Sequence, residues 1–357
     1  MRTVYLIRHG EPDFPDGQRL CISRTDLPLS TVGRMQGVLL AAALGNTGLS
    51  GVYHSGALRA SQTAVCLSPD ARRAEGFEEL GVGDWEGLTF QEIRKRYPKE
   101  YELRGKAPFD HLIPGGERPA DCLDRAKHAL RGLLERTEGS IAVVTHAGLC
   151  RLLLNELLKR PPEEFLDVPQ PYGCVNVLQY EDEKLTVLSV GTRPHPSLED
   201  TLCEKLHKAA GTPEAVYRHC LAVADKADAL AALMERRGIA LDRKTLRAAA
   251  LLHDIARTAP DHAAAGADWL ARLGYPTVGE IVSCHHDWSG EDPEDMPEAA
   301  LVYVADKLVQ GDQVVTLEER FEKSLKACLT PEAKAAHQRR WEWAKTLYDH
   351  VTAGTGN

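Results

Sequence analysis

The sequence predicts two domains of different class, an α/β domain followed by an all-α domain. Up to about residue 193, short runs of Val, Ile and Leu alternate with helical patterns, which is typical of α/β folds. From about residue 200 the strand-like runs disappear, and segments rich in Ala and Leu take over. The polar, proline-containing stretch GTRPHPSLED separates the two textures. In a chain of 357 residues we therefore place domains at 1–193 and 205–350, joined by a linker at 194–204.

The strands of the first domain are expected at apolar runs bounded by Gly, Pro or polar residues. These runs are VYLI at 4–7, VYH at 52–54, IAVVTH at 141–146, VNVLQY at 175–180 and LTVLSV at 185–190. A helix is expected to begin after Ser30, a good N-cap residue, in STVGRMQGVLLAAAL. A second helix should carry Arg59 after VYH, and Gly148 should open a third helix after IAVVTH.

The second domain is expected to consist of helices, because its apolar residues recur at helical spacing. The expected segments are LAVADKADALAALMERRG at 221–238, KTLRAAALLHDIAR at 244–257, AAGADWLARLG at 264–274 and EAALVYVADKLV at 298–309. Residues from about 316 are expected to form a helical extension that packs on this bundle, with an interaction surface as the alternative.

Composition excludes some classes of function. The formal net charge of −9 argues against a broad nucleic-acid-binding face. No apolar stretch approaches the roughly 20 residues of a membrane span, and Met1 leads straight into a strand without a signal-peptide core. Nine scattered cysteines without a C-x-x-C pair favour reduced thiols over a disulfide framework. We expect a cytoplasmic protein.

Two histidines of the first domain follow strands. Arg8 and His9 come at the end of VYLI, and His146 comes at the end of IAVVTH. Because ligands of open α/β sheets collect at the carboxyl ends of strands, these side chains should converge there with Arg59. A neutral imidazole can attack phosphorus, arginines can hold the phosphoryl oxygens, and an acid can protonate the leaving oxygen. The pattern therefore points to the cleavage of a phosphomonoester.

Six motifs in order resemble the histidine phosphatase superfamily, which has the phosphoglycerate mutase-like fold. They are RHG at 8–10, DLPLSTVGR at 26–34, SGALRASQTA at 55–64, EELGVGDWEG at 78–87, PGGE at 114–117 and VVTHAG at 143–148. The resemblance covers residues 1–193 and implies that His9 becomes phosphohistidine. It also implies that Arg8, Arg59 and His146 form the phosphate pocket, without a cofactor in this domain.

The proton donor has three candidates, Glu79, Asp84 and Glu86. The family pattern places the role on Glu79, while the other two acids have the alternative of being loop or helix-start groups. Ser23 and Arg118 depart from residues common in the family near the pocket, so the substrate stays open. The sequence looks closer to phosphatases, including the α-ribazole phosphatase type, than to mutases.

The second domain contains a series of metal-ligand residues. These residues are His219, His253, Asp254, His262, His285, His286 and Asp306. Imidazoles and carboxylates from different helices suit Mn, Fe or a similar divalent ion that keeps positions open for water and substrate. The remaining histidines of this half, His195, His207, His337 and His350, are expected to be ordinary exposed residues.

This series resembles the HD-domain phosphohydrolases over residues 205–315. By that resemblance His219, His253, Asp254 and Asp306 are the core metal ligands, and His262, His285 and His286 are the additional ligands of members that hold two ions. Lys307 has two alternatives, a phosphate contact or a solvated helix residue. The tripeptide Gly274-Tyr275-Pro276 precedes the histidine pair, so we interpret it as a turn.

The leading hypothesis is a bifunctional phosphohydrolase, a histidine phosphatase fused to a metal-dependent HD phosphohydrolase. Its expected partners are small phosphorylated metabolites or nucleotides, with no nucleic acid and no membrane, and a homo-oligomer stays open. One alternative is a phosphatase regulated by a non-catalytic HD domain that senses metal or nucleotide. The other is a phosphoglycerate mutase-like first half.

Overall fold

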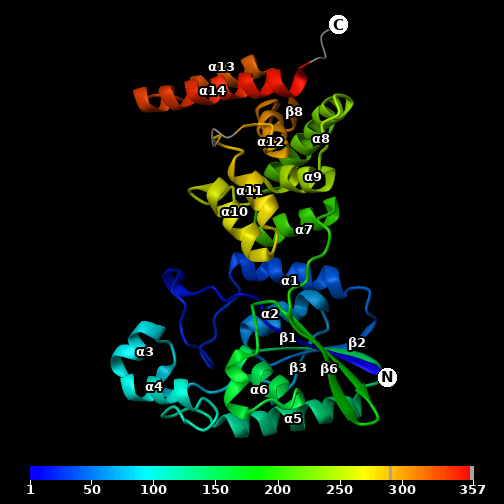
Figure 1. Ribbon diagram of the computed structural model, residues 1–357, viewed down its shortest axis with the longest axis vertical. Coiled ribbons are helices and arrows are strands. Elements are labelled where there is room, and N and C mark those ends of the chain that lie inside the picture. The colour runs from blue at the N-terminus through cyan, green and yellow to red at the C-terminus, as the bar shows by residue number, and fades with distance from the viewer. Residues whose placement is uncertain (289–291, 354–357) are drawn as a thin grey trace. The chain divides into compact units, whose positions relative to one another are not determined.

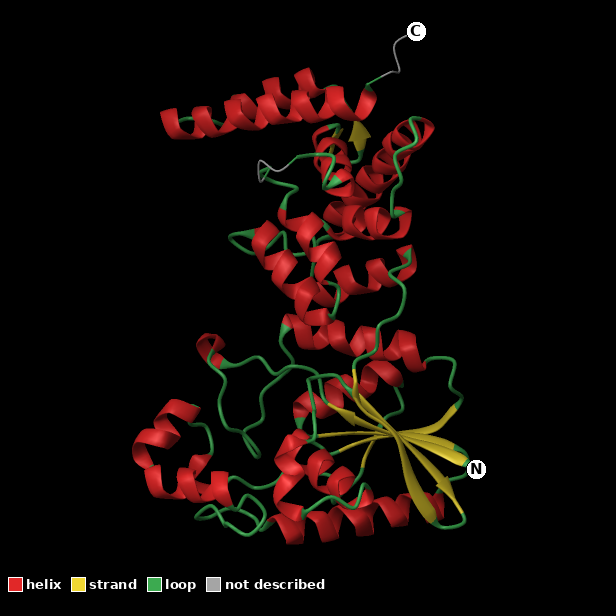
Figure 2. Cartoon of the chain, in the orientation of Figure 1, coloured by secondary structure: helices red, strands yellow, loops and turns green. Residues whose placement is uncertain are grey.

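The computed structural model describes residues 1–288 and 292–353. The chain divides into two compact units, Met1–Pro196 and Ser197–Asn357. The first unit contains a sheet with helices, and the second is largely helical (Figure 2). The predicted order of an α/β domain followed by a helical bundle is therefore confirmed. A helix begins at Asp200, so the second half of the predicted linker 194–204 is helical instead of extended.

The first unit is built on a six-stranded sheet with the order β3-β2-β4-β1-β5-β6. Strands β1 to β4 run parallel, and β5 and β6 are added antiparallel at one edge. The strands are β1 Arg2–Arg8, β2 Leu49–His54, β3 Arg72–Arg73, β4 Ser140–Thr145, β5 Val175–Glu181 and β6 Lys184–Thr192. The five sequence runs assigned to strands all lie in this sheet.

Helices cover both faces of this sheet (Figure 1). The helices α1 and α2 pack on one face around Ile7, Ala142 and Val144, and α5 and α6 pack on the other around Leu6 and Val143. The unit's helices are α1 Thr31–Leu44, α2 Leu58–Leu67, α3 Phe90–Arg96, α4 Pro98–Lys106, α5 Pro119–Arg136 and α6 Ala147–Leu157. Successive side chains of β1 and β4 point to opposite faces of the sheet, so each face has its own apolar layer.

The parallel register of β1 and β4 positions the expected site. Arg8 of β1 is paired with Thr145 of β4. The next residues, His9 and His146, therefore leave the sheet side by side at its carboxyl edge. His146 is the N-cap residue of α6, as expected from the helix predicted at Gly148. On the neighbouring helix α1, the predicted cap Ser30 accepts a hydrogen bond from the backbone N–H of Gly33.

The second unit is a bundle with one small hairpin. Its helices are α7 Asp200–Ala210, α8 Glu214–Arg236, α9 Arg243–Leu252, α10 His262–Leu273, α11 Pro276–Ser283, α12 Pro297–Lys307, α13 Leu317–Leu325 and α14 Pro331–Thr352. The strands β7 Val309–Gln310 and β8 Gln313–Val314 pair around Gly311, which has a positive φ of 63°. The sequence pattern missed this hairpin because two residues per strand carry no periodicity.

Two local predictions for the bundle are sharpened by the structure. The helix expected at 244–257 ends at Leu252, and His253 and Asp254 follow in its last turn and the loop. Gly274 ends α10 in the left-handed conformation with φ 99°, and Pro276 opens α11, so the turn expected there is present. The extension beyond residue 316 is the helix pair α13 and α14.

Within residues 1–288 and 292–353, no helix has both the length and the apolar character needed to cross a membrane. The nine cysteines are free thiols.

Candidate functional site

The carboxyl edge of the sheet opens into a cavity of about 380 Å³. Four of the five residues expected from the sequence to do chemistry line it: Arg8, His9, Arg59 and Glu79. The fifth, His146, is fully buried behind His9, with the two ring centroids 5.0 Å apart. The fold thus brings together the five residues that the sequence separates by up to 138 positions, from Arg8 to His146.

The His9 ring is held in one tautomer. Its Nδ1 lies 2.6 Å from the carbonyl oxygen of Gly10, to which it donates, and this leaves Nε2 as the unprotonated nitrogen that carries the lone pair. Nε2 accepts a hydrogen bond of 3.3 Å from Nε of Arg59. Burial, with help from Arg8 and Arg59, lowers the pKa of His9 well below its usual value. The imidazole of His9 is therefore neutral at pH 7.

The arginines are positioned by backbone carbonyls. Arg59, which is 1 % exposed, donates from Nη1 to the carbonyl oxygen of Thr25 at 2.8 Å and from Nη2 to that of Ser23 at 3.1 Å. Arg8 donates to the carbonyl oxygen of Gln170, and its Nε is buried without a partner within the described residues. Burial lowers the pKa of both guanidinium groups, but an arginine side chain is not deprotonated in proteins. Two buried cations beside a neutral imidazole form a site for an anion such as phosphate.

His146 is fixed in the complementary tautomer. Its Nδ1 lies 3.4 Å from Nη2 of Arg59, and its Nε2 lies 2.7 Å from Oγ of Ser55. Because a guanidinium can only donate, Nδ1 accepts and Nε2 donates to Ser55. Burial, His9 and the arginines lower the pKa of His146 well below its usual value. Ser55 was not singled out from the sequence, although it stands at the start of the SGALRASQTA motif.

The three candidate acids have different surroundings. The Glu79 carboxylate lines the cavity and accepts hydrogen bonds from the backbone N–H groups of Gly148 and Leu149, at the N-terminus of α6. Glu86 is occupied in a loop, since it accepts from Ser23 and Thr25, and these bonds lower its pKa although burial opposes them. Asp84 is exposed. Of the three, only Glu79 is among the residues that line the cavity.

Further residues of this cavity were missed by sequence reasoning. The Tyr172 ring stacks on the Arg8 guanidinium, 3.7 Å from Cζ to the ring centroid. Three more arginines line the cavity, Arg19, Arg104 and Arg151, and Nη1 of Arg104 is buried without a partner within the described residues. Scattered arginines carry no spacing signal, so only the folded chain identifies them. Ser23 and Arg118, which differ from the residues common in the family, are not among the residues that line this cavity.

The neutral state of His9 gives a testable pH prediction. A histidine with a lowered pKa stays neutral as the pH falls through 6.5, where a free histidine takes up a proton. Nitrogen NMR of labelled protein from pH 7.5 to 5.5 should show the His9 ring as the Nδ1–H tautomer throughout. Protonation of the His9 ring within this pH range would contradict the lowered pKa.

In the second unit, two groups of side chains have ligand atoms within 4.8 Å of one another. One group is His219, His253 and Asp254, and the other is Asp254, His262 and His285. Asp254 belongs to both groups, so its carboxylate lies between them. Apart from His253, which is fully buried, the residues of both groups line a cavity of about 450 Å³. The helix ends and loops around α8 to α11 thus gather residues that span 67 positions, from His219 to His285.

The ring orientations fit a divalent metal ion. Nδ1 of His219, His253 and His285 lies 2.8, 2.8 and 2.6 Å from the carbonyl oxygens of Gly311, Ala250 and Val282. Each ring therefore donates Nδ1–H to the backbone and turns Nε2 toward Asp254 or Asp306, which is the usual arrangement of metal-binding histidines. Nε2 of His253 and Oδ1 of Asp254 are buried without a hydrogen bond within the described residues. Buried polar atoms left without partners are the atoms that a metal ion would satisfy.

The remaining expected ligands lie around these groups. Oδ1 of Asp306 is 3.0 Å from Nε2 of His219 and 3.6 Å from Nε2 of His253. His286 lies outside both groups, with its side chain 44 % exposed and Nδ1 3.0 Å from Oδ2 of Asp287. Lys307 is buried and donates to Asp306 at 2.7 Å and to the carbonyl of His285 at 2.8 Å. It is therefore not a solvated helix residue, and it holds the Asp306 carboxylate in place.

Three histidines expected to be exposed are not, namely His207, His337 and His350, of which His350 is half-buried. His207 is 2 % exposed, and its Nε2 donates to the carbonyl oxygen of Leu251 at 2.7 Å, near the end of α9. His337 lines the metal-group cavity from α14. The helix α7, which carries His207, was not among the predicted segments. The helical extension predicted beyond residue 316 is present, but its pattern did not show which of its side chains are covered.

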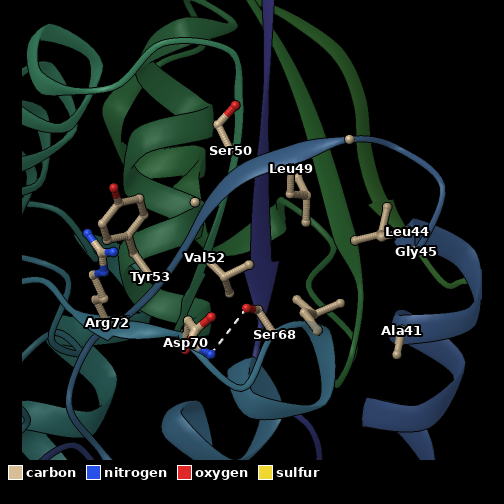
Figure 3. Close-up of a pocket in the computed structure, with 13 residues that line it drawn as sticks. Ala41, Leu44, Gly45, Leu49, Ser50, Val52, Tyr53, Ser68, Asp70 and Arg72 are labelled. Atoms are coloured by element: carbon tan, nitrogen blue, oxygen red, sulfur yellow. Dashed lines mark hydrogen bonds between the residues drawn. The ribbon is translucent and has the colours of Figure 1, made fainter.

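A third cavity, of about 460 Å³, lies beside β2 and the C-terminal ends of α1 and α2 (Figure 3). Its polar lining includes Ser50, Asp70 and Arg72, and the Asp70 N–H donates to Oγ of Ser68. None of the residues that line it was expected to do chemistry, and its volume alone assigns it no role.

Two stretches of the chain match known families. Residues 4–193 match the histidine phosphatase superfamily (branch 1), and residues 216–310 match the HD domain. Both matches agree with the resemblances noted in the sequence. They leave residues 311–357, which include α13 and α14, outside either family.

Individual relatives match the first half. Phosphoglycerate mutase-like protein 4 of Arabidopsis thaliana is 31 % identical over 209 residues, which are 56 % of this chain and 87 % of that protein. The 6-phosphofructo-2-kinase/fructose-2,6-bisphosphatase of Caenorhabditis elegans is 32 % identical over 174 residues, which are 47 % of this chain and 37 % of that protein. The chain thus spans less than half of that protein's length. The structure of Bacillus stearothermophilus YhfR superposes with a TM-score of 0.50 at 28 % identity, over 54 % of this chain and 97 % of that one.

Proposed function

Because this chain belongs to the histidine phosphatase superfamily through residues 4–193 and carries an HD domain at residues 216–310, we propose that it is a bifunctional phosphohydrolase. The first half cleaves a phosphomonoester through a phosphohistidine. The second half hydrolyses a phosphate ester or anhydride of a nucleotide-like substrate. The observation that carries the first activity is a neutral His9 whose unprotonated Nε2 lies beside two buried arginines.

In the first half, Nε2 of His9 attacks phosphorus while the ester P–O bond breaks. Arg8 and Arg59 hold the phosphoryl oxygens as their charge spreads. The carboxyl group of Glu79 gives its proton to the leaving oxygen, and the alcohol departs. Water then attacks the phosphohistidine, Glu79 takes a proton from that water, and the P–N bond breaks to release phosphate. His9 returns to its neutral state, so the cycle is complete without a cofactor.

In the second half, the residues that would hold metal are His219, His253, Asp254, His262, His285 and Asp306, with His286 at the rim. We propose that two divalent ions, Fe or Mn, would be held there, one by each group, and Asp254 belongs to both groups. Such ions lower the pKa of bound water and polarise phosphate oxygens. Lys307 holds the Asp306 carboxylate, and His207 supports the backbone at the end of α9, next to His253 and Asp254.

The proposed substrates are small phosphorylated metabolites. The relatives named above include a fructose-2,6-bisphosphatase and a phosphoglycerate mutase-like protein, and this chain's first cavity adds Arg19, Arg104 and Arg151 to aromatic and aliphatic walls. Such a lining suits a phosphomonoester with further anionic or polar groups. Two phosphate-cleaving halves on one chain favour successive steps on one metabolite, because a product released by one half is locally concentrated for the other. A cytoplasmic location and an α-ribazole phosphatase-like substrate for the first half remain part of this proposal.

The test combines metal content with phosphate release. Protein purified without added metal is analysed for metal and then assayed on a panel of phosphomonoesters and dinucleotides, with and without chelator. We expect about two metal ions per chain. Chelation should abolish one class of activity and leave the phosphomonoesterase intact, because only the second site uses metal.

Two results would contradict the proposal in different ways. Absence of both metal and chelator-sensitive hydrolysis would favour the alternative of a non-catalytic second half. Transfer of the phosphoryl group to an added phosphorylated sugar acid, without release of phosphate, would favour the mutase alternative for the first half.

A further inference from the structure

The cavity of the metal groups has a second wall that the HD domain does not supply. Of its lining residues, Arg320, Phe321 and Ser324 come from α13, Cys328 from the following turn, and His337 and Arg340 from α14. All of these lie beyond residue 310, where the family match ends. The cavity of about 450 Å³ falls within the range of roughly 300–1,000 Å³ typical of small-molecule sites. It is therefore large enough for more than the phosphoryl group that reacts.

The two walls differ in charge. The wall of the metal groups contains the carboxylates of Asp254 and Asp306. The wall from α13 and α14 contributes arginines, and none of its lining residues within the described chain is a carboxylate. A ligand that spans the cavity should therefore present an anion to the wall from α13 and α14 as well.

Of the three arginines around the cavity, two lie near a carboxylate of the described residues and one does not. Arg340 is neutralised by Asp287, with distances of 2.6 Å from Nε to Oδ1 and 2.9 Å from Nη2 to Oδ2. Nη1 of Arg257 lies 3.7 Å from Oδ1 of Asp254. The guanidinium of Arg320, which is half-buried, has no hydrogen-bond or ion-pair partner in residues 1–288 and 292–353. A half-buried guanidinium without a partner on a cavity wall is suited to bind an anion in a bidentate manner.

The surroundings of Arg320 are rigid enough to position it. The neighbouring Phe321 is 7 % exposed, and its ring packs edge-on against the rings of His337 and Trp341, with centroids 5.2 and 5.1 Å apart. Nε2 of His337 lies 3.1 Å from the carbonyl oxygen of Phe321, which ties α14 to α13. Thr316 caps α13 in a capping box with Glu319, so the helix that carries Arg320 begins at a fixed point.

We propose that Arg320 forms a second phosphate subsite, so that the second half takes phosphoanhydrides, in which a distal phosphate binds Arg320 while the other faces Asp254 and Asp306. This inference rests on the proposed phosphohydrolase activity of that half and narrows its substrate from esters or anhydrides to anhydrides. The helix pair α13 and α14 is then the specificity element that this chain adds to its HD domain.

The test measures binding of inorganic pyrophosphate and orthophosphate to the full-length, manganese-loaded chain by titration calorimetry. Arg320→Gln should weaken pyrophosphate binding about tenfold or more and change orthophosphate binding less than about twofold. Arg320→Lys should fall in between, because it keeps the charge but not the bidentate geometry. Arg339→Gln, an exposed control on α14, should match the unaltered chain. The first half's phosphate pocket is the same in all variants, so its contribution cancels.

The outcomes separate this inference from the proposed activity. The subsite is overturned if Arg320→Gln binds both anions as Arg339→Gln does. It is also overturned if Arg320→Gln weakens the binding of pyrophosphate and of orthophosphate by the same factor. A further outcome is that Arg320→Gln selectively weakens the binding of pyrophosphate while the unaltered chain hydrolyses no phosphoanhydride. In that case the subsite stands, and the proposed hydrolase activity of this half is overturned. Unchanged metal content and melting temperature in the variants show that the comparison concerns folded, loaded protein.

Discussion

Replacing His9 by Asn should lower the chelator-resistant phosphomonoesterase activity by about 10⁴-fold or more. The nucleophile is lost, and removal of a nucleophile typically costs this much because binding contacts alone give only residual catalysis. Asn fits the volume of the site and can keep a polar contact with Gly10, so the fold should persist. The measurement is steady-state phosphate release in the presence of chelator, together with detection of an acid-labile phosphoenzyme that the variant should not form.

The matched control is His128→Asn, which changes an exposed histidine of α5 and should leave the rate unaltered. Metal-dependent hydrolysis and metal content should be the same in His9→Asn as in the unaltered chain. Chelator-resistant activity that persists in His9→Asn, with a phosphoenzyme still formed, would place the nucleophile elsewhere.

Replacing Asp254 by Ala should have the second large effect. Its carboxylate belongs to both metal groups, and its Oδ1 lies 3.3 Å from Nε2 of His262 and 3.4 Å from Nε2 of His285. Both groups lose a ligand at once. We expect most of the bound metal to be lost and metal-dependent hydrolysis to fall by about 10³-fold or more, since even supporting residues of metal sites cost 10–100-fold. Metal analysis and a chelator-sensitive assay measure the two effects.

Asp268→Ala is the control, because Asp268 is exposed on α10 and forms a surface ion pair with Arg272. The variant Asp254→Ala also decides between the two hypotheses for the second half. In a sensor, Asp254→Ala would change the regulation of the phosphatase half, and there would be no hydrolysis of its own to lose. In an enzyme, hydrolysis is lost and the phosphomonoesterase continues.

The two halves differ in how far their sites follow from the sequence. Arg8, His9 and His146 stand at the ends of strands that local apolar runs identify, and the parallel pairing of Arg8 with Thr145 brings them together. Strand order and parallel pairing follow from fold class, so this convergence could be predicted. In the second half the ligands come from the starts, ends and interiors of helices. Their types were evident from the sequence, but their division into two groups around Asp254 was not.

The sequence by itself determined the two fold classes, the order of the domains, the cap at Ser30 and the residue types that chemistry requires. Periodicity and turn residues express local preferences, and these act within a few residues of the chain. Only the tertiary structure decided that Glu79 faces the cavity while Glu86 is occupied by Ser23, and that His207 and Lys307 are buried supports. It also decided that Arg320, outside the HD domain, reaches the metal-group cavity. Packing sets the distance between side chains far apart in sequence, because burial and hydrogen bonding select among helix faces that the pattern leaves equivalent.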